Sequence, residues 1–212
     1  MSYTIREEGI GEYIEKKSVF TGRIRRVTSE EEARDFIAAI KKQERGARHN
    51  VFAYIIGEGD IIRYSDDGEP QGTGGQPVLH VLTAQELTDV CLVVTRYFGG
   101  VLLGAPGLTR AYGKAAGEAV ASVRRWQLAS ARVFSVVLPY DVHARLTSFL
   151  ENVQLLDTSY GEEVTLMVIT EVSNEEALRQ GFTDLSGGQA RLGEARTAPC
   201  FLREDGVLEE IS

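Results

Sequence analysis

The segment from Ser65 to Gly75 carries the residue types most able to do chemistry in this chain of 212 residues. It reads Ser-Asp-Asp-Gly-Glu-Pro-Gln-Gly-Thr-Gly-Gly, with three carboxylates, four glycines and two hydroxyl side chains. Glycine costs backbone entropy and buries almost nothing, so such a segment is kept for the shape of a loop or for what the loop touches. We therefore expect the function of the chain to depend on this loop.

The three carboxylates allow two interpretations. Asp66, Asp67 and Glu69 can bind Mg²⁺ or act as acid and base, because neighbouring carboxylates shift one another's affinity for protons. Alternatively, Asp66 and Asp67 accept hydrogen bonds from the backbone of their own turn, as aspartates commonly do. No histidine stands at a defined spacing from the carboxylates, so the sequence predicts no metal site and names no catalytic residue.

Two glycine-rich loops each lead toward the start of an expected helix. Gly72 to Gly75 precedes Pro77, and the segment from Gly99 and Gly100 onward precedes Leu108. Backbone amides at a helix N-terminus can bind an anion, and glycine lets the anion approach closely. Neither loop ends in Gly-Lys-Ser/Thr, and neither has the G-x-G-x-x-G spacing of a dinucleotide site. The loops therefore allow a small anionic ligand and do not fit a P-loop or dinucleotide site.

Histidines differ in what their surroundings indicate. His49 and Asn50 stand where a helix is expected to give way to a strand, a place from which side chains often project into a cleft. His80 lies among apolar residues and is expected to be a core histidine.

Arginine and aromatic side chains flank the second glycine-rich loop. Arg96 and Arg110 can hold an anion, or can pair with the carboxylates of the first loop and fix its shape. Tyr97, Phe98 and Tyr112 can stack on a nucleobase, although core packing is the favoured interpretation.

Hydrophobic periodicity and turn residues predict the elements that must position these side chains. The capping box Ser29-Glu-Glu-Glu32 begins an amphipathic helix that continues toward Gly46. A region over 13–27 is read as one or two strands, with Gly22 as a bend. The other expected elements of this half are strands over 50–56, 61–64 and 89–97, and helices over 78–85 and 108–123. The second glycine-rich loop is expected over 98–107.

The pattern restarts after Arg125. Strands are expected over 131–138, 153–160, 163–170 and 189–201, with a helix over 142–150 between the first two. The capping box Ser173-Asn-Glu-Glu176 leads into a second helix that ends near Leu185. The resulting order β-α-β-β-α-β is that of the split, ferredoxin-like unit.

Charge divides the chain near the same place. Residues 1–130 hold 17 basic and 17 acidic residues, and residues 131–212 hold 6 basic and 14 acidic residues, so the net charge of −8 lies in the second part. We expect two domains, 1–130 and 131–212, of α+β class, and no generic nucleic-acid binding by the second. Cys91 and Cys200 are expected to be small buried hydrophobes.

Targeting and membrane signals are missing from the sequence. No apolar run reaches the roughly 18 residues that cross a bilayer, and the first residues lack the pattern of a signal peptide. We expect a cytoplasmic protein that binds no membrane.

Three blocks of the sequence resemble one known family. They are Arg48-His-Asn-Val-Phe-Ala-Tyr54, Ser65-Asp-Asp-Gly-Glu-Pro-Gln-Gly-Thr73, and Val93-Val-Thr-Arg-Tyr-Phe-Gly-Gly100 followed by Gly107-Leu-Thr-Arg-Ala-Tyr112. In order, spacing and identity these blocks are similar to the IMPACT family, specifically its bacterial YigZ-type members. The resemblance is strong over residues 1–125 and extends by topology over the rest. Pro106, Arg48 and Val51 depart from the family pattern, in which glycine, threonine and cysteine are common.

The resemblance implies a fold and a biological setting. The first domain is expected to have the α/β sandwich of the second domain of a small-subunit ribosomal protein, and the second domain is expected to be ferredoxin-like. Both are similar to the tip domains of the elongation factor that drives translocation. The eukaryotic relatives regulate translation by competing for an activator of the kinase that phosphorylates an initiation factor. For the bacterial members the resemblance implies a link to translation and no particular reaction.

Three functional hypotheses follow. The first is a non-catalytic binding protein that contacts RNA, the ribosome or a translation factor through the glycine-rich cleft of the first domain. The second is an enzyme that acts on a small phosphorylated or nucleotide ligand, and the third is an interaction module whose acidic second domain docks a basic partner. We favour the first, with no cofactor, and predict that the ligand or partner is bound by His49, Asn50, Ser65, Asp66, Asp67, Glu69, Gly72, Thr73, Gly74, Arg96, Tyr97, Gly99, Gly100, Arg110 and Tyr112.

Overall fold

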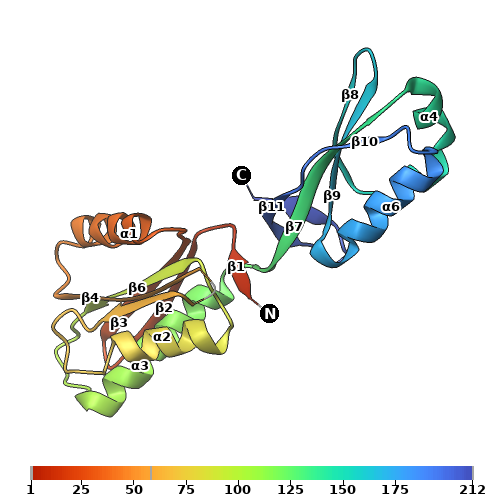
Figure 1. Ribbon diagram of the computed structural model, residues 1–212. Coiled ribbons are helices and arrows are strands. Elements are labelled where there is room, and N and C mark those ends of the chain that lie inside the picture. The colour runs from red at the N-terminus through yellow and green to blue at the C-terminus, as the bar shows by residue number, and fades with distance from the viewer. Residues whose placement is uncertain (1, 58, 212) are drawn as a thin grey trace. The chain divides into compact units, whose positions relative to one another are not determined.

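The computed structural model describes residues 2–57 and 59–211, which form two compact units. The first unit extends to Trp126 and the second begins at Gln127. Each unit contains both helices and a sheet (Figure 1), so the chain has the mixed α and β composition and the two-domain organisation that the sequence predicts.

The first unit is built on a five-stranded antiparallel sheet. Its strands, in spatial order, are β2 (Gly9–Glu15), β3 (Ser18–Arg26), β6 (Val90–Tyr97), β4 (His49–Ile56) and β5 (Ile61–Ser65). The region expected to hold one or two strands thus holds two. They are joined at Lys16 and Lys17, whose φ angles of 45° and 68° suit a tight hairpin turn. A short strand, β1 (Tyr3–Ile5), was not predicted.

Helices cover both faces of this sheet. Helix α1 (Glu30–Gln43) packs Phe36 and Ile40 on one face, and α2 (Gly75–Ala84) and α3 (Gly104–Ala121) cover the other (Figure 1). The hydroxyl of Ser29 accepts a hydrogen bond from the backbone N–H of Glu32, which confirms the predicted helix start. The central strand β6 is buried from Val90 to Arg96, as its unbroken apolar sequence predicts.

Both helices on the second face begin earlier than the sequence predicts. Helix α2 begins at Gly75, and α3 begins at Gly104, so Pro106 lies in the first turn of α3, where proline is tolerated. The second glycine-rich loop is therefore confined to residues 98–103. Gly22 is not a bend, because it stands within an unbroken ladder opposite Gly11 and Val94.

The second unit has one helix-covered sheet with strand order β12-β11-β7-β9-β8. The element order follows the predicted β-α-β-β-α-β pattern, with β12 and the short β10 in addition. The strands are β7 (Arg125–Leu138), β8 (Leu155–Tyr160), β9 (Val164–Glu171), β10 (Arg191–Leu192), β11 (Arg196–Leu202) and β12 (Leu208–Glu210), and the helices are α4 (Tyr140–Arg145), α5 (Thr147–Leu150) and α6 (Glu175–Leu185).

Two local predictions for this unit are wrong. The helix expected over 142–150 is divided into α4 and α5 at Leu146. The capping box at Ser173 does not form, because a 3₁₀ turn, η1 (Val172–Asn174), precedes α6 and the Ser173 hydroxyl instead meets the carboxylate of Glu171 at 3.5 Å. Asn174 caps α6 without a side-chain hydrogen bond.

Both cysteines are buried and unpaired, as expected. Burial raises the pKa of the Cys91 thiol far above its ordinary value. Among the described residues, no helix combines the length and the apolar character needed to cross a membrane.

Candidate functional site

The carboxylate of Asp66 occupies the N-terminus of helix α2. It accepts hydrogen bonds from the backbone N–H groups of Gly72, Gly74 and Gly75 at 2.8, 2.9 and 2.8 Å. These are the amides that the sequence offers to an anionic ligand. The chain itself supplies the anion, which confirms for Asp66 the interpretation that its carboxylate bonds the loop's own backbone.

The ionisation of Asp66 is tied to folding. Burial raises the pKa of this carboxyl, but the hydrogen bonds from Gly72, Gly75 and Gly74 outweigh burial and hold the pKa below its ordinary value. A carboxylate with a lowered folded pKa stabilises the fold above its unfolded pKa of about 3.9, and this contribution is lost as the pH falls through the folded pKa.

We expect Asp66→Asn to lower the free energy of unfolding by about 1–2 kcal/mol near neutral pH, because charge-assisted hydrogen bonds to three amides become neutral ones. The difference from the natural chain should shrink below about pH 4, where the natural carboxyl also becomes neutral. Urea unfolding followed by the fluorescence of Trp126, the one tryptophan of the chain, measures both values. A difference that is the same at neutral and acid pH would contradict this account.

Asp67 joins the loop to strand β4 and helix α1. Its carboxylate accepts hydrogen bonds from the backbone N–H of Asn50 at 2.7 Å and from Nζ of Lys41 at 2.5 Å. The backbone carbonyl of Asp67 lies 2.8 Å from Nδ1 of His49. A carbonyl can only accept, so Nδ1 carries the proton and the other ring nitrogen, Nε2, has its lone pair or its own proton to offer. The φ angle of Asp67 is 46°, in the left-handed region.

Glu69 forms the buried centre of the loop. Its Oε1 accepts hydrogen bonds from Nη1 of Arg96 at 2.6 Å and from the hydroxyl of Tyr112 at 2.8 Å. The side chains of Arg96 and Glu69 are 9% and 4% exposed, so this ion pair lies in the interior. Burial and the charge of Glu69 raise the pKa of Tyr112, whose hydroxyl therefore stays protonated as a donor.

Other predicted site residues complete the internal structure of the first loop and join strands β4 and β6. The Ser65 hydroxyl accepts from the backbone N–H of Asp67, and the Thr73 hydroxyl donates to the carbonyl of Pro70. The buried amide of Asn50 accepts from the Thr95 hydroxyl at 2.8 Å.

The second glycine-rich loop lies directly against the hairpin of β2 and β3. The backbone N–H of Gly99 donates to the Ser18 hydroxyl, and a Cβ at Gly99 would lie 2.0 Å from the carbonyl carbon of Lys17. Gly100 has a φ of 84°, which favours glycine.

A pocket of about 230 Å³ opens where β4 begins and β6 ends. The antiparallel register places His49 opposite Arg96 across these strands. The residues that line the pocket, which we call the His49 pocket, are Arg48, His49, Arg96, Phe98 and Leu102. The structure thus brings together two predicted site residues, His49 and Arg96, with three others.

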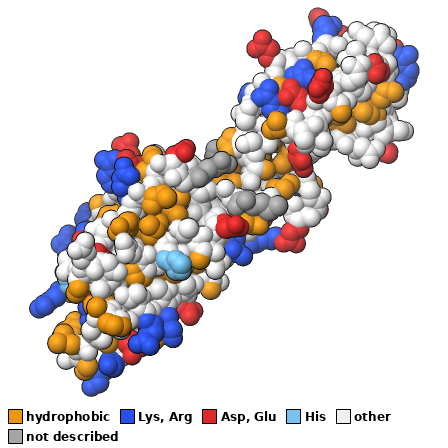
Figure 2. Space-filling model, turned by 60° about the horizontal axis from the view of Figure 1, so that its bottom comes forward, with side chains coloured by type: hydrophobic (Ala, Val, Ile, Leu, Met, Phe, Trp, Pro, Cys, Tyr) orange, Lys and Arg blue, Asp and Glu red, His pale blue; other side chains and the backbone are white. Residues whose placement is uncertain are grey.

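Apolar side chains stand exposed beside the His49 pocket. Phe98 is 52% exposed and Leu102 is 84% exposed, and Tyr97, whose hydroxyl donates to a carboxylate oxygen of Glu44, is 38% exposed. The core-packing interpretation is therefore wrong for Tyr97 and Phe98, and it is confirmed for Tyr112, which is fully buried. Figure 2 shows Lys and Arg side chains interspersed with hydrophobic ones on one face of the molecule.

The predicted site residue Arg110 and the expected core histidine His80 both lie away from the His49 pocket. Arg110 is exposed on α3, is absent from the lining of the His49 pocket and makes no ion pair with any described residue. His80 is exposed on α2, so the expectation of a core histidine is wrong; its apolar neighbours Val78 and Leu82 face the core, whereas His80 faces away.

Sequence reasoning did not assign Arg48, Phe98 or Leu102 to the site. A usable signal was present for the first of these, because Arg48 directly precedes His49 at the start of a strand. For Phe98, stacking on a base was the alternative to the favoured core packing. No signal distinguished Leu102, since the direction of an apolar side chain in a glycine-containing loop depends on the tertiary path of the backbone. Within the described residues, no group of three or more His, Cys, Asp or Glu is placed to hold a metal ion.

Known protein families, proteins and structures match this chain over most of its length. The Impact N-terminal domain matches residues 16–120, and a domain of unknown function, DUF1949, matches residues 136–189. IMPACT family member YvyE of Bacillus subtilis (strain 168) is 39% identical over 195 residues, which are 91% of this chain and 90% of that protein. IMPACT family member YigZ of Escherichia coli (strain K12) is 28% identical over 182 residues, 84% of this chain and 89% of its own length. A crystal structure titled as that of an hypothetical protein aligns with a TM-score of 0.59 and 26% identity, over 91% of this chain and 96% of that one.

Proposed function

Because the chain belongs to the IMPACT family, we propose that it is a non-catalytic regulatory protein of translation that binds single-stranded RNA of the ribosome through its first unit. The link to translation rests on the family, whose eukaryotic members regulate that process. The choice of RNA rests on one observation, the exposed aromatic ring of Phe98 at a pocket that is also lined by Arg48 and His49.

The exposed ring supports recognition of unpaired bases. Stacking of a base on an aromatic side chain contributes about 1–3 kcal/mol and does not require a particular base. Leu102 and Val101 extend the apolar surface beside Phe98. His49 lines the same pocket, and its Nε2, which is not used in the contact with Asp67, can bond a base edge or a phosphate oxygen.

The charges around the pocket support contact with the RNA backbone. Arg48, which lines the pocket, is exposed and forms no ion pair with any described residue. The carboxylates of Asp67 and Glu69 are compensated by Lys41 and Arg96. The first part of the chain is neutral overall, so we expect few phosphate contacts and a shallow dependence of affinity on salt.

The hypothesis of an enzyme receives less support from the geometry. The three carboxylates proposed to bind a metal or move a proton, those of Asp66, Asp67 and Glu69, are each engaged by donors of the same unit. The amides of the first loop, proposed to hold a phosphate, are bonded to Asp66. Three residues that line the His49 pocket remain accessible for binding. Arg48 forms no ion pair with a described residue, Nε2 of His49 is not used in the contact with Asp67, and Phe98 is 52% exposed.

Binding to a fluorescent single-stranded RNA of about 12 nucleotides, measured by anisotropy, tests the proposal. We expect Phe98→Ala to weaken binding about tenfold, the loss of one stacked base. Arg48→Gln should weaken binding less and should reduce the slope of log affinity against log salt by about 0.7, the contribution of one phosphate contact on a single strand.

Matched variants of the second unit serve as controls. Leu185→Ala removes an exposed apolar side chain and Arg145→Gln removes an exposed cation, and both should bind RNA as the natural chain does. Co-sedimentation with ribosomes at low salt should be lost in the double variant Phe98→Ala with Arg48→Gln. Unchanged RNA affinity in Phe98→Ala, or ribosome association that persists in the double variant, would refute an RNA site at this pocket.

A further inference from the structure

The row of side chains that contains His49 crosses four strands of the first unit. His49 of β4 lies opposite Arg96 of β6. Arg96 in turn lies opposite Phe20 of β3, and Phe20 lies opposite Tyr13 of β2. Residues directly opposite in antiparallel strands share one face of the sheet, which here is the face covered by α2 and α3. The row therefore leads from the His49 pocket to the hairpin that joins β2 and β3.

Two lysines form the tip of this hairpin. Lys16 and Lys17 are exposed, and neither forms an ion pair or a hydrogen bond with any described residue. The second glycine-rich loop packs directly on them, since a Cβ at Gly99 would lie 2.0 Å from the carbonyl carbon of Lys17. Gly99 follows Phe98 in the chain, so the two lysines are neighbours of the loop that carries the exposed ring.

Helix α3 adds two more cations beside the hairpin. The Nζ atom of Lys114 lies 4.8 Å from the centroid of the Tyr13 ring. Arg110 is one turn nearer the start of α3, and residues four apart lie on the same side of a helix. Both side chains are exposed and form no ion pair with any described residue. We call this group of four cations the basic edge; it consists of Lys16, Lys17, Arg110 and Lys114.

Carboxylates offset only part of this positive charge. Glu15 lies on the same face of the sheet, and its Oε2 accepts a hydrogen bond from the Tyr13 hydroxyl at 2.7 Å. Glu118 is one turn beyond Lys114 on α3, further from the start of the helix. Glu12 alternates with Tyr13 along β2 and therefore lies on the opposite face. Four cations against two carboxylates leave a surface that attracts anions.

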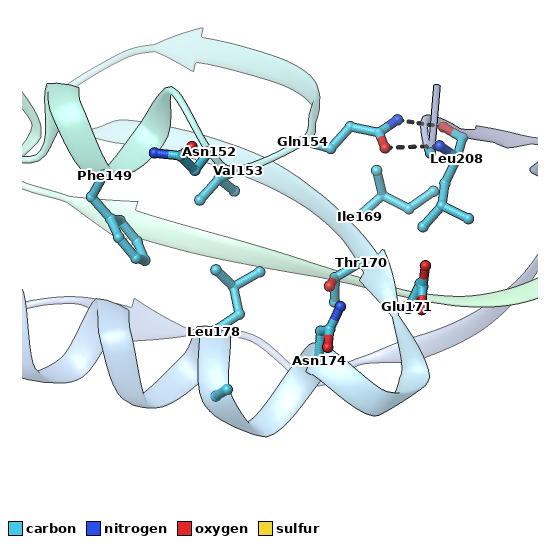
Figure 3. Close-up of a pocket in the computed structure, with 12 residues that line it drawn as sticks. Phe149, Asn152, Val153, Gln154, Ile169, Thr170, Glu171, Asn174, Leu178 and Leu208 are labelled. Atoms are coloured by element: carbon cyan, nitrogen blue, oxygen red, sulfur yellow. Dashed lines mark hydrogen bonds between the residues drawn. The ribbon is translucent and has the colours of Figure 1, made fainter. Parts of the chain in front are cut away.

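The second unit offers no comparable surface. Residues 131–212 contain six arginines and no lysine, and each arginine forms an ion pair with a carboxylate of that unit. Among the described residues that line its pocket of about 410 Å³, Glu171 is the one ionisable side chain, and the Gln154 amide is bonded to the backbone of Leu208 (Figure 3). Further phosphate contacts of a bound RNA are therefore expected on the first unit.

We propose that the basic edge binds phosphates of the same RNA strand whose unpaired base stacks at the His49 pocket, an inference that rests on the proposed function. Lysine ammonium groups bind phosphates as point charges without a fixed geometry, which suits a strand of any sequence. The hairpin lies two to three strand spacings from β4, roughly 10–15 Å. The ligand is thus an unpaired segment of several nucleotides rather than a single exposed base.

RNAs of two lengths separate the basic edge from the pocket. A single strand of about 4 nucleotides should occupy the pocket alone, whereas one of about 12 should also reach the basic edge. Lys16→Gln with Lys17→Gln should weaken binding of the longer RNA about tenfold at about 50 mM salt. It should also reduce the slope of log affinity against log salt by about 1.4, the contribution of two phosphate contacts on a single strand. Binding of the shorter RNA, followed by amide chemical shifts of the isotope-labelled full chain, should not change.

Matched variants distinguish contact from general charge. Lys16→Arg with Lys17→Arg keeps both charges and should retain the affinity and the slope. Arg34→Gln with Arg145→Gln removes two exposed cations, one from the first turns of α1 and one from α4, and should leave both RNAs bound as by the natural chain. Arg110→Gln with Lys114→Gln should reduce the slope for the longer RNA by at least about 0.7.

The outcomes separate the basic edge from the proposed function. If Phe98→Ala weakens binding but the Lys16→Gln, Lys17→Gln variant binds the longer RNA with natural affinity and slope, the basic edge is refuted and the pocket stands. If Phe98→Ala changes neither affinity, or if neither RNA binds, both proposals fail. Equal weakening of the shorter RNA by the lysine variant, or displacement of the longer RNA by an equal concentration of a polyglutamate peptide, would also overturn the inference.

Discussion

Glu69→Gln should lower the free energy of unfolding of the first unit by about 3 kcal/mol, because it leaves a buried positive charge without its counter-charge. Glutamine has nearly the shape of glutamate, so packing is retained. Arg96, however, keeps a guanidinium that is 9% exposed, and its Nε already makes no hydrogen bond in the described chain. Urea unfolding followed by Trp126 fluorescence should show a lower midpoint at an unchanged slope.

The control for this substitution is an ion pair of the same unit at the surface. Glu8→Gln removes a pair with Arg25 in which the side chains are 61% and 43% exposed, and it should cost below about 1 kcal/mol. The double variant Glu69→Leu with Arg96→Met removes both buried charges and should cost less than Glu69→Gln alone. If Glu69→Gln and Glu8→Gln lower the free energy of unfolding equally, the buried ion pair contributes no more to stability than the exposed one.

The buried pair also marks how far the sequence could predict the site. Pairing of Arg96 with one of three carboxylates was an open alternative, because charge and loop position favour it locally. The choice of Glu69 over Asp66 and Asp67 follows from the tertiary fold: Asp66 is bound to the amides that begin α2, and Asp67 to the backbone N–H of Asn50. Nothing local to the loop places the Tyr112 hydroxyl, 43 residues further along, on the same oxygen atom.

Local signals succeeded where a short segment decides the structure by itself. The Ser29 cap and the periodic apolar face of α1 are contained in one helix and were predicted. The similar pattern at Ser173 failed because the backbone enters α6 through a 3₁₀ turn that follows directly on β9. The prediction of core packing failed at Phe98 for a similar reason. Phe98 and Tyr112 have similar hydrophobic character, but only Tyr112 lies on the core face of a helix.

The same dependence on tertiary contact predicts opposite effects at two glycines. Gly11→Ala should destabilise the first unit by about 3 kcal/mol, because an added Cβ would lie 2.3 Å from the backbone nitrogen of Ala119 and 2.4 Å from the carbonyl carbon of Glu118. The colliding atoms belong to the backbone of α3, so relief requires the helix to move off the sheet. Urea unfolding followed by Trp126 fluorescence measures the loss.

Gly117→Ala places the same methyl group on α3 itself, where no described atom other than the neighbouring residues and backbone of that helix lies within 4 Å. It should raise the free energy of unfolding by about 0.5–1 kcal/mol, because alanine restricts the unfolded chain and favours the helix. Opposite signs at Gly11 and Gly117 are therefore expected from one chemical change. If Gly11→Ala raises the free energy of unfolding or leaves it unchanged, α3 can move away from β2 at little cost. The close approach of this helix to the sheet would then not be the reason why position 11 requires glycine.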